Sequence, residues 1–73
     1  MADIRVKSEI TGKVWAIEAK PGDRLNEEDP IIVLESMKME IPVVAPANGT
    51  LKEILVEQGE SVQEGQVVAV LEG

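Results

Sequence analysis

Short apolar segments rich in valine and isoleucine recur along the chain, separated by turns that contain glycine or proline. Helical periodicity is weak throughout, whereas β-branched residues between turn residues are typical of strands. Turns are predicted at residues 20–23 and 58–60, which read Lys-Pro-Gly-Asp and Gln-Gly-Glu. The predicted strands cover residues 4–7, 12–19, 31–35, 41–44, 49–56 and 67–72, and two brief strands are expected around Leu25 and Val62.

This pattern occurs twice. Residues 4–35 align with residues 41–72 without a gap, at an offset of 37, and nine of the aligned pairs are identical where composition alone would give about two or three. A unit of three or four short strands cannot bury a core, but two such units facing each other can. The repeat predicts one all-β domain over residues 1–73, a flattened β-barrel or sandwich of two four-stranded antiparallel sheets with pseudo-two-fold symmetry.

Apolar spacing inside the second strand of each repeat departs from simple alternation. Val14 and Ile17 differ by three positions, as do Leu51 and Ile54, so strict alternation would place each pair on opposite faces of its sheet. An extra residue in each strand resolves the conflict. We therefore predict a β-bulge in both strands.

The repeats are joined by residues 36–40, Ser-Met-Lys-Met-Glu, which are expected to form a hairpin tip opposite the two termini. Tight hairpins normally contain glycine or asparagine, because the favoured turns need positive φ angles. A turn with Lys38 between Met37 and Met39 breaks this rule, as functional sites often do. The alternative is a straight strand over residues 31–44 with both methionines in the core, but typical strands have 3–10 residues.

Composition restricts the chemistry that this chain can perform. The 73 residues contain no cysteine and no histidine, so a disulfide, a zinc site and a thiol or histidine catalyst are absent, and neither a catalytic centre nor a metal site is expected. A net charge of −7 disfavours nucleic acid as a partner. No apolar stretch approaches the ~20 residues of a membrane span. We expect a cytoplasmic, monomeric protein that is not an enzyme.

The run from Glu35 to Glu40 resembles the biotin-attachment signature, in which a lysine lies between two methionines. The chain as a whole resembles the biotinyl/lipoyl attachment domain family, and in particular the small stand-alone attachment proteins of bacteria. The resemblance extends to other positions where biotinyl domains carry glycine, proline or alanine: Gly12, Gly22, Pro46, Ala47, Gly49, Gly59 and Gly65. One position departs from it, since Glu28 stands where many relatives have glycine. Either Glu28 accepts the backbone geometry of that glycine, or the turn differs.

The resemblance implies a biotin carboxyl carrier. A biotin-protein ligase would attach biotin covalently to Lys38, and the arm would carry a carboxyl group between a biotin carboxylase and a carboxyltransferase. Met37 and Met39 would contribute to recognition by these partners. Glu35, Ser36 and Glu40 would frame the hairpin, although Glu35 and Glu40 are equally consistent with a solubilising role.

Two other functions stay open on the sequence alone. Lys38 could carry a lipoyl group, added by a lipoate ligase, for a dehydrogenase-type complex, or it could accept either group. Lipoyl domains usually have Asp-Lys-Ala around the lysine, so positions 37 and 39 favour biotin. An unmodified interaction or adaptor module is the other alternative. Trp15, the single aromatic residue, is either part of the core or a contact for a partner.

Overall fold

The computed structural model describes residues 2–73, which fold into eight strands. The strands are β1 (Asp3–Lys7), β2 (Gly12–Ile17), β3 (Arg24–Leu25), β4 (Pro30–Ser36), β5 (Met39–Val44), β6 (Gly49–Ile54), β7 (Ser61–Val62) and β8 (Val67–Glu72). They form two four-stranded antiparallel sheets with the orders β1-β8-β6-β3 and β5-β4-β2-β7. Within the described residues no helix is long and apolar enough to cross a membrane.

The sheet orders confirm the predicted pseudo-two-fold symmetry. Exchanging each strand for its counterpart in the other repeat converts the first sheet into the second, and each sheet contains two strands from each repeat. Turn hydrogen bonds follow the same symmetry: Gly22 N–H donates to Leu51 O, and the equivalent Gly59 N–H donates to Val14 O, both at 2.8 Å. The two repeats therefore depend on each other for backbone pairing.

Both predicted bulges are present. The pairing of β2 with β4 shifts between Val14 and Ala16, and that of β6 with β8 shifts between Leu51 and Glu53. The extra residues are Trp15 and Lys52, which occupy equivalent positions in the two repeats. Each bulge changes the alternation of the residues that follow it. Ile54 thereby packs against the core three positions after Leu51, whereas the equivalent Ile17 stays 38% exposed.

The strands β2 and β6 are shorter than predicted, since they end at Ile17 and Ile54 rather than at residues 19 and 56. The N–H groups of Glu18 and Ala19 both donate to the carbonyl oxygen of Ile31, at 2.8 and 3.1 Å. Two donors on one acceptor cannot continue a regular ladder, so the strand ends although Ala19 is still buried.

The core lies between the two sheets, and both repeats contribute to it. Its most completely buried side chains are Ile31, Ile32, Leu34, Val62, Val68, Ala69 and Leu71. Leu34 on β4 and Leu71 on β8 are symmetry equivalents. Both strands are inner strands of their sheets: β4 pairs with the edge strand β5, and β8 pairs with the edge strand β1. Because β4 is anchored in this core, the hairpin that it forms with β5 extends from a rigid base.

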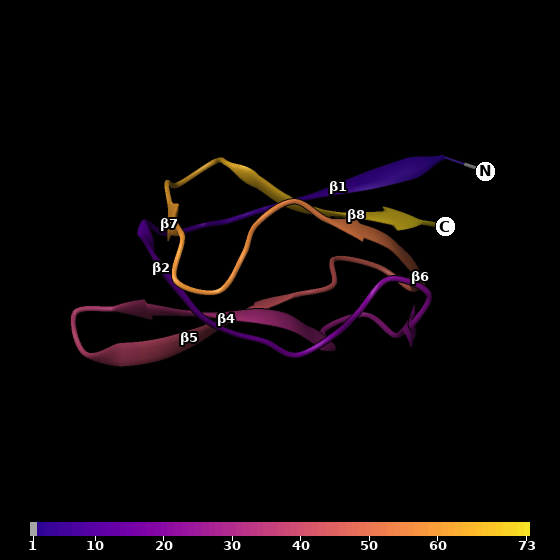
Figure 1. Cartoon of the computed structure of the whole chain (residues 1–73). Coiled ribbons are helices and arrows are strands. Elements are labelled where there is room, and N and C mark those ends of the chain that lie inside the picture. Colours follow the sequence, from indigo (N-terminus) through magenta and orange to yellow (C-terminus); the bar gives the residue numbers. More distant parts are fainter. Residues whose placement is uncertain (1) are drawn as a thin grey trace.

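The molecule is elongated, with principal extents of 36 × 19 × 18 Å. Figure 1 shows the β4–β5 hairpin projecting at one end, while the start of β1 and the end of β8 lie together at the other. The expected position of the hairpin tip, opposite the termini, is confirmed.

Candidate attachment site

The hairpin tip is a two-residue turn. Strands β4 and β5 pair from Pro30 with Val44 out to Ser36 with Met39, which leaves Met37 and Lys38 in the loop. Their φ angles are 53° and 65°. Two successive residues with positive φ define a type I′ turn, which matches the twist of hairpin strands. The straight strand over residues 31–44 is therefore ruled out.

This turn is built from residue types that disfavour it. A side chain in the left-handed region costs roughly 1–2 kcal/mol because Cβ approaches the neighbouring carbonyl oxygen, and neither Met37 nor Lys38 has the local hydrogen-bonding group with which asparagine offsets that cost. Because the loop has only two residues, Lys38 lies at the outermost point of a regular hairpin. A longer loop would hold it less firmly. The positive φ angles at residues 37 and 38 thus reduce the stability of the fold, but they hold the Lys38 side chain in a defined place.

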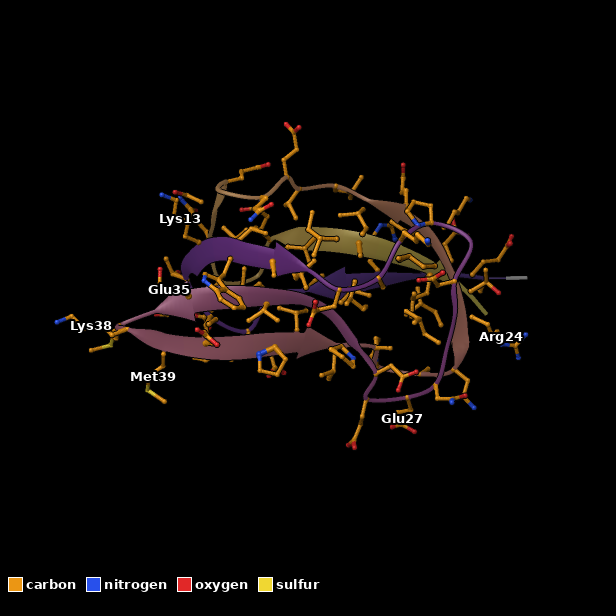
Figure 2. All side chains as sticks on the ribbon, turned by 60° about the horizontal axis from the view of Figure 1, so that its bottom comes forward. Lys13, Arg24, Glu27, Glu35, Lys38 and Met39 are labelled. Carbon is orange, nitrogen blue, oxygen red and sulfur yellow. The ribbon has the colours of Figure 1, made fainter. Side chains whose placement is uncertain are left out.

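All three side chains at the tip face solvent. Met37 is 91% exposed and Met39 is 63% exposed, so neither belongs to the core. The Lys38 side chain is also exposed and extends beyond the end of the ribbon in Figure 2. Among residues 2–73 its amine has no hydrogen-bond or ion-pair partner. A primary amine in this setting is free to enter the active site of another protein.

Two carboxylates lie directly behind the tip. Glu35 on β4 pairs with Glu40 on β5, and both are exposed. Like charges opposite each other in an antiparallel pair are unfavourable, but Lys13 on β2 pairs with Glu35 from the other side. Figure 2 shows Lys13 and Glu35 at the same end of the molecule as Lys38. A charged row, Lys13, Glu35 and Glu40, therefore crosses β2, β4 and β5 next to the tip that carries the Lys38 amine.

Ser36, the third residue expected to frame the hairpin, is half-buried and closes the ladder opposite Met39. Two features of this region were not predicted from the sequence, the position of Lys13 beside Glu35 and the close contact of Gly12. A Cβ on Gly12 would lie 2.8 Å from the carbonyl oxygen of Glu35, so only glycine lets β2 approach β4 here. A Cβ on the equivalent Gly49 would lie 2.9 Å from Glu72 O. The presence of glycine at this position in both repeats was the sequence feature that could have predicted the close contact.

Glu28 lies far from the tip. It has a φ of 76°, close to the 86° of its counterpart Gly65, so the first alternative, that Glu28 accepts the geometry of a glycine, is confirmed. Its neighbour Glu27 appears at the end of the molecule opposite Lys38 in Figure 2. Glu28 therefore bears on the stability of the fold rather than on the tip.

A hollow of about 270 Å³ lies between the edge strands β1 and β5. It is lined by residues of these strands and the loops next to them, including Arg5, Lys7, Ile10, Val43 and Pro46. Neither Lys38 nor its methionine neighbours contribute to it. The tip is thus an exposed projection, a geometry that suits a group delivered to other proteins.

The chain was compared with known proteins. Residues 4–71 match the Biotin_lipoyl family model, described as "Biotin-requiring enzyme". A biotin/lipoyl attachment protein of Bacillus subtilis is 39% identical over 66 residues, which cover 90% of both chains. A biotinylated protein TB7.3 homolog of Mycobacterium leprae is 38% identical over 90% of this chain and 93% of its own.

Among solved structures, the urea carboxylase of Kluyveromyces lactis contains a segment that superimposes with a TM-score of 0.94 at 35% identity. The match covers 99% of this chain but only 6% of that enzyme. The similarity thus concerns one small part of a large carboxylase. Together, the family match over residues 4–71 and the relatives of nearly equal length show that the chain belongs to the biotin/lipoyl attachment family.

Proposed function

We propose that this protein is a biotin carboxyl carrier and that Lys38 is the residue to which biotin is attached. The observation that carries the proposal is the type I′ turn that holds an unpaired lysine between two exposed methionines at the end of the molecule. Similarity to a biotinylated protein and to part of a carboxylase supports biotin as the attached group.

Attachment uses Lys38 as a nucleophile toward an activated acyl group. The Nζ of Lys38 attacks the carbonyl carbon of biotinyl-adenylate held by a biotin-protein ligase, the amide bond forms, the bond from that carbon to the phosphate oxygen breaks, and AMP leaves. Attack requires the neutral amine, so the ligase must accept the protons that the nitrogen gives up as the amide forms. This chain supplies the amine and its position, and the ligase supplies the catalysis.

Once attached, biotin supplies a ring nitrogen that can carry a carboxyl group between a biotin carboxylase and a carboxyltransferase. The chain's own contribution is positional. Its rigid hairpin places the base of the arm at one end of a 36 Å molecule, and tethering replaces diffusion by a high local concentration at each partner site. In this proposal the partner enzymes carry out the carboxyl transfer, and the chain acts as a carrier.

Lipoyl attachment is the second candidate function, because the relative from Bacillus subtilis is described as a biotin/lipoyl attachment protein. The same exposed amine could form an amide with a lipoyl group by the same acyl transfer. Met37 and Met39 favour biotin, since the resemblance to lipoyl domains would lead us to expect aspartate and alanine at these positions.

Intact mass after enzymatic modification tests the proposal. The purified protein is incubated with MgATP, biotin and a biotin-protein ligase, and in parallel with MgATP, lipoate and a lipoate ligase, with Lys38→Ala as the control in both. We expect one biotinyl increment that is lost in Lys38→Ala and no lipoyl increment. A lipoyl increment alone would reassign the carrier to a dehydrogenase-type system, and no increment in either reaction would contradict attachment altogether.

A further inference from the structure

The pseudo-two-fold symmetry allows the outer faces of the two sheets to be compared position by position. On the sheet that carries the tip, Ala16, Val33 and Pro42 form one row across β2, β4 and β5. The equivalent row on the other sheet consists of Glu53, Val70 and Arg5. The central valine is common to both rows, but its neighbours are apolar on the tip-bearing sheet and charged on the other.

Two further positions extend the same contrast. The bulge residue is Trp15 on β2 and Lys52 on β6, and the outward residue near the end of the edge strand is Val44 on β5 and Lys7 on β1. Trp15 is 48% exposed and Val44 is 38% exposed. Lys52, in contrast, forms a surface ion pair with Asp3 at 3.1 Å. We call Trp15, Ala16, Val33, Pro42 and Val44 the apolar row.

Folding does not require an apolar residue at four of the five positions of the apolar row, all except Val33. The inward positions of the same strands are apolar in both repeats, as with Val14 and Leu51 or Leu34 and Leu71, because both line the shared core. The outward positions carry charges on β1 and β6, and those strands form the same ladder as their counterparts. Within the apolar row, Trp15, Pro42 and Val44 are exposed, whereas Ala16 and Val33 are half-buried. Exposed apolar residues that the fold does not need, gathered on one face, are typical of an interaction site.

The place of the apolar row indicates which partner uses it. Pro42 follows Lys38 by four residues on the same hairpin, about 13 Å along a strand. A protein interface of standard size covers about 800 Å² on each partner, which is roughly 30 Å across. A partner that encloses the tip from this side therefore covers the apolar row as well. The charged row of Lys13, Glu35 and Glu40 lies between the two and would fix the orientation.

The ligase is the partner that needs such close contact. It must bring an acyl carbon within bonding distance of the Lys38 amine before any cofactor arm exists, so its surface has to pack against the hairpin itself. Enzymes that act on the modified protein bind the end of the arm attached to Lys38. They therefore do not need to contact the sheet. We propose that the apolar row is a docking surface for the ligase that acylates Lys38, with Trp15 as its main anchor. This proposal rests on the proposed function.

The test is a comparison of ligase kinetics for three variants. Trp15→Lys introduces the residue that the equivalent bulge already accommodates as Lys52, so the fold should tolerate it. Leu55→Lys is the control for the loss of apolar surface and the added charge. Leu55 is 46% exposed and directly follows β6, a strand of the other sheet. Trp15→Phe keeps an aromatic ring. Rates are measured with a biotin-protein ligase, biotin and MgATP over a range of carrier concentrations.

For Trp15→Lys we expect kcat/KM to fall about tenfold or more, as for loss of an aromatic interface anchor, mainly through KM. Complete modification at high ligase concentration and the unfolding midpoint should be preserved. Leu55→Lys should stay within about twofold of the wild type, and Trp15→Phe should retain most of the activity. If Trp15→Lys proves unstable, Val44→Lys, which mirrors Lys7, takes its place with a smaller expected loss.

Docking by the apolar row would be contradicted if Trp15→Lys matched the wild type or if Leu55→Lys lost as much activity. Either result would leave biotinylation of Lys38 intact. A wild-type protein that gains no biotin at any ligase concentration would instead contradict the proposed function, so the two failures are distinguishable.

Discussion

At the level of single residues, side-chain exposure and backbone geometry indicate which residues serve partners and which stabilise the fold. The two methionines beside Lys38 and Glu28 are the examples. Met37 and Met39 contact mainly solvent, so their apolar side chains contribute little to the core. Glu28 makes a backbone hydrogen bond to Ala45 O at 2.8 Å, and this bond is independent of its side chain. The first two residues should therefore matter to partners, and the third to the fold.

Met37→Ala should reduce the rate of biotinylation at limiting carrier concentration several-fold while leaving the free energy of unfolding within about 0.5 kcal/mol of the wild type, as for an ordinary surface substitution. The reason is that the thioether is exposed and available to a partner. Ligase kinetics and thermal unfolding of the same sample check both parts. A drop of several degrees in Tm with an unchanged rate would assign Met37 to the fold.

Glu28→Gly should stabilise the protein by about 0.5–1 kcal/mol, since glycine relieves the cost of a side chain at a φ of 76° and loses part of that gain to the entropy of the unfolded chain. Urea unfolding measures the change. Glu27→Gly is the matched control, because Glu27 is not among the described residues with positive φ, and it should be neutral or destabilising. Equal effects of both variants would show that backbone strain at Glu28 is negligible.

At the scale of elements, the hairpin combines a rigid ladder with a strained turn. Leu34 anchors β4 in the core, Gly12 lets β2 approach it closely, and the turn at Met37 and Lys38 adopts positive φ without glycine. A hairpin optimised only for stability would carry asparagine and glycine here. The sequence of the turn is therefore best explained by the requirement for a lysine at its apex.

Lys38→Gly should be more stable than Lys38→Ala by about 1 kcal/mol, because glycine adopts a φ of 65° without a Cβ penalty. For a domain of this size that difference corresponds to about 4–8 °C in Tm. In the neighbouring strand the order should reverse, with Glu35→Gly less stable than Glu35→Ala, since glycine weakens a strand. If Lys38→Gly were the less stable of the first pair, the type I′ geometry of the tip would be wrong.

Much of the fold could be predicted from local patterns. The repeat gave the pseudo-two-fold arrangement, and the apolar spacing of Val14 and Ile17 indicated the bulge at Trp15. The end of β2 could not be predicted, because it depends on Ile31 O accepting two donors, the N–H groups of Glu18 and Ala19. Lys13 was missed for the same reason: its place beside Glu35 follows from the register between β2 and β4, which the order of residues does not reveal.

At the scale of the whole molecule, the two repeats build a symmetric scaffold whose two faces and two ends differ. Symmetry accounts for the core, the paired turns and the close contacts of Gly12 and Gly49. Three features break it: the Met-Lys-Met tip, the apolar row on the tip-bearing sheet, and Glu28 in place of glycine. The first two lie on the same hairpin or beside it, which concentrates the proposed contacts with partners at one end and one face.

The most direct test of this account is to identify the group on Lys38 in protein isolated from its native cells. Proteolytic digestion followed by tandem mass spectrometry of the peptide that contains Ser36 to Glu40 gives both the attached mass and the modified residue. We expect a biotinyl amide on Lys38. A lipoyl group on Lys38, or a peptide that is unmodified in cells with an active biotin-protein ligase, would contradict it.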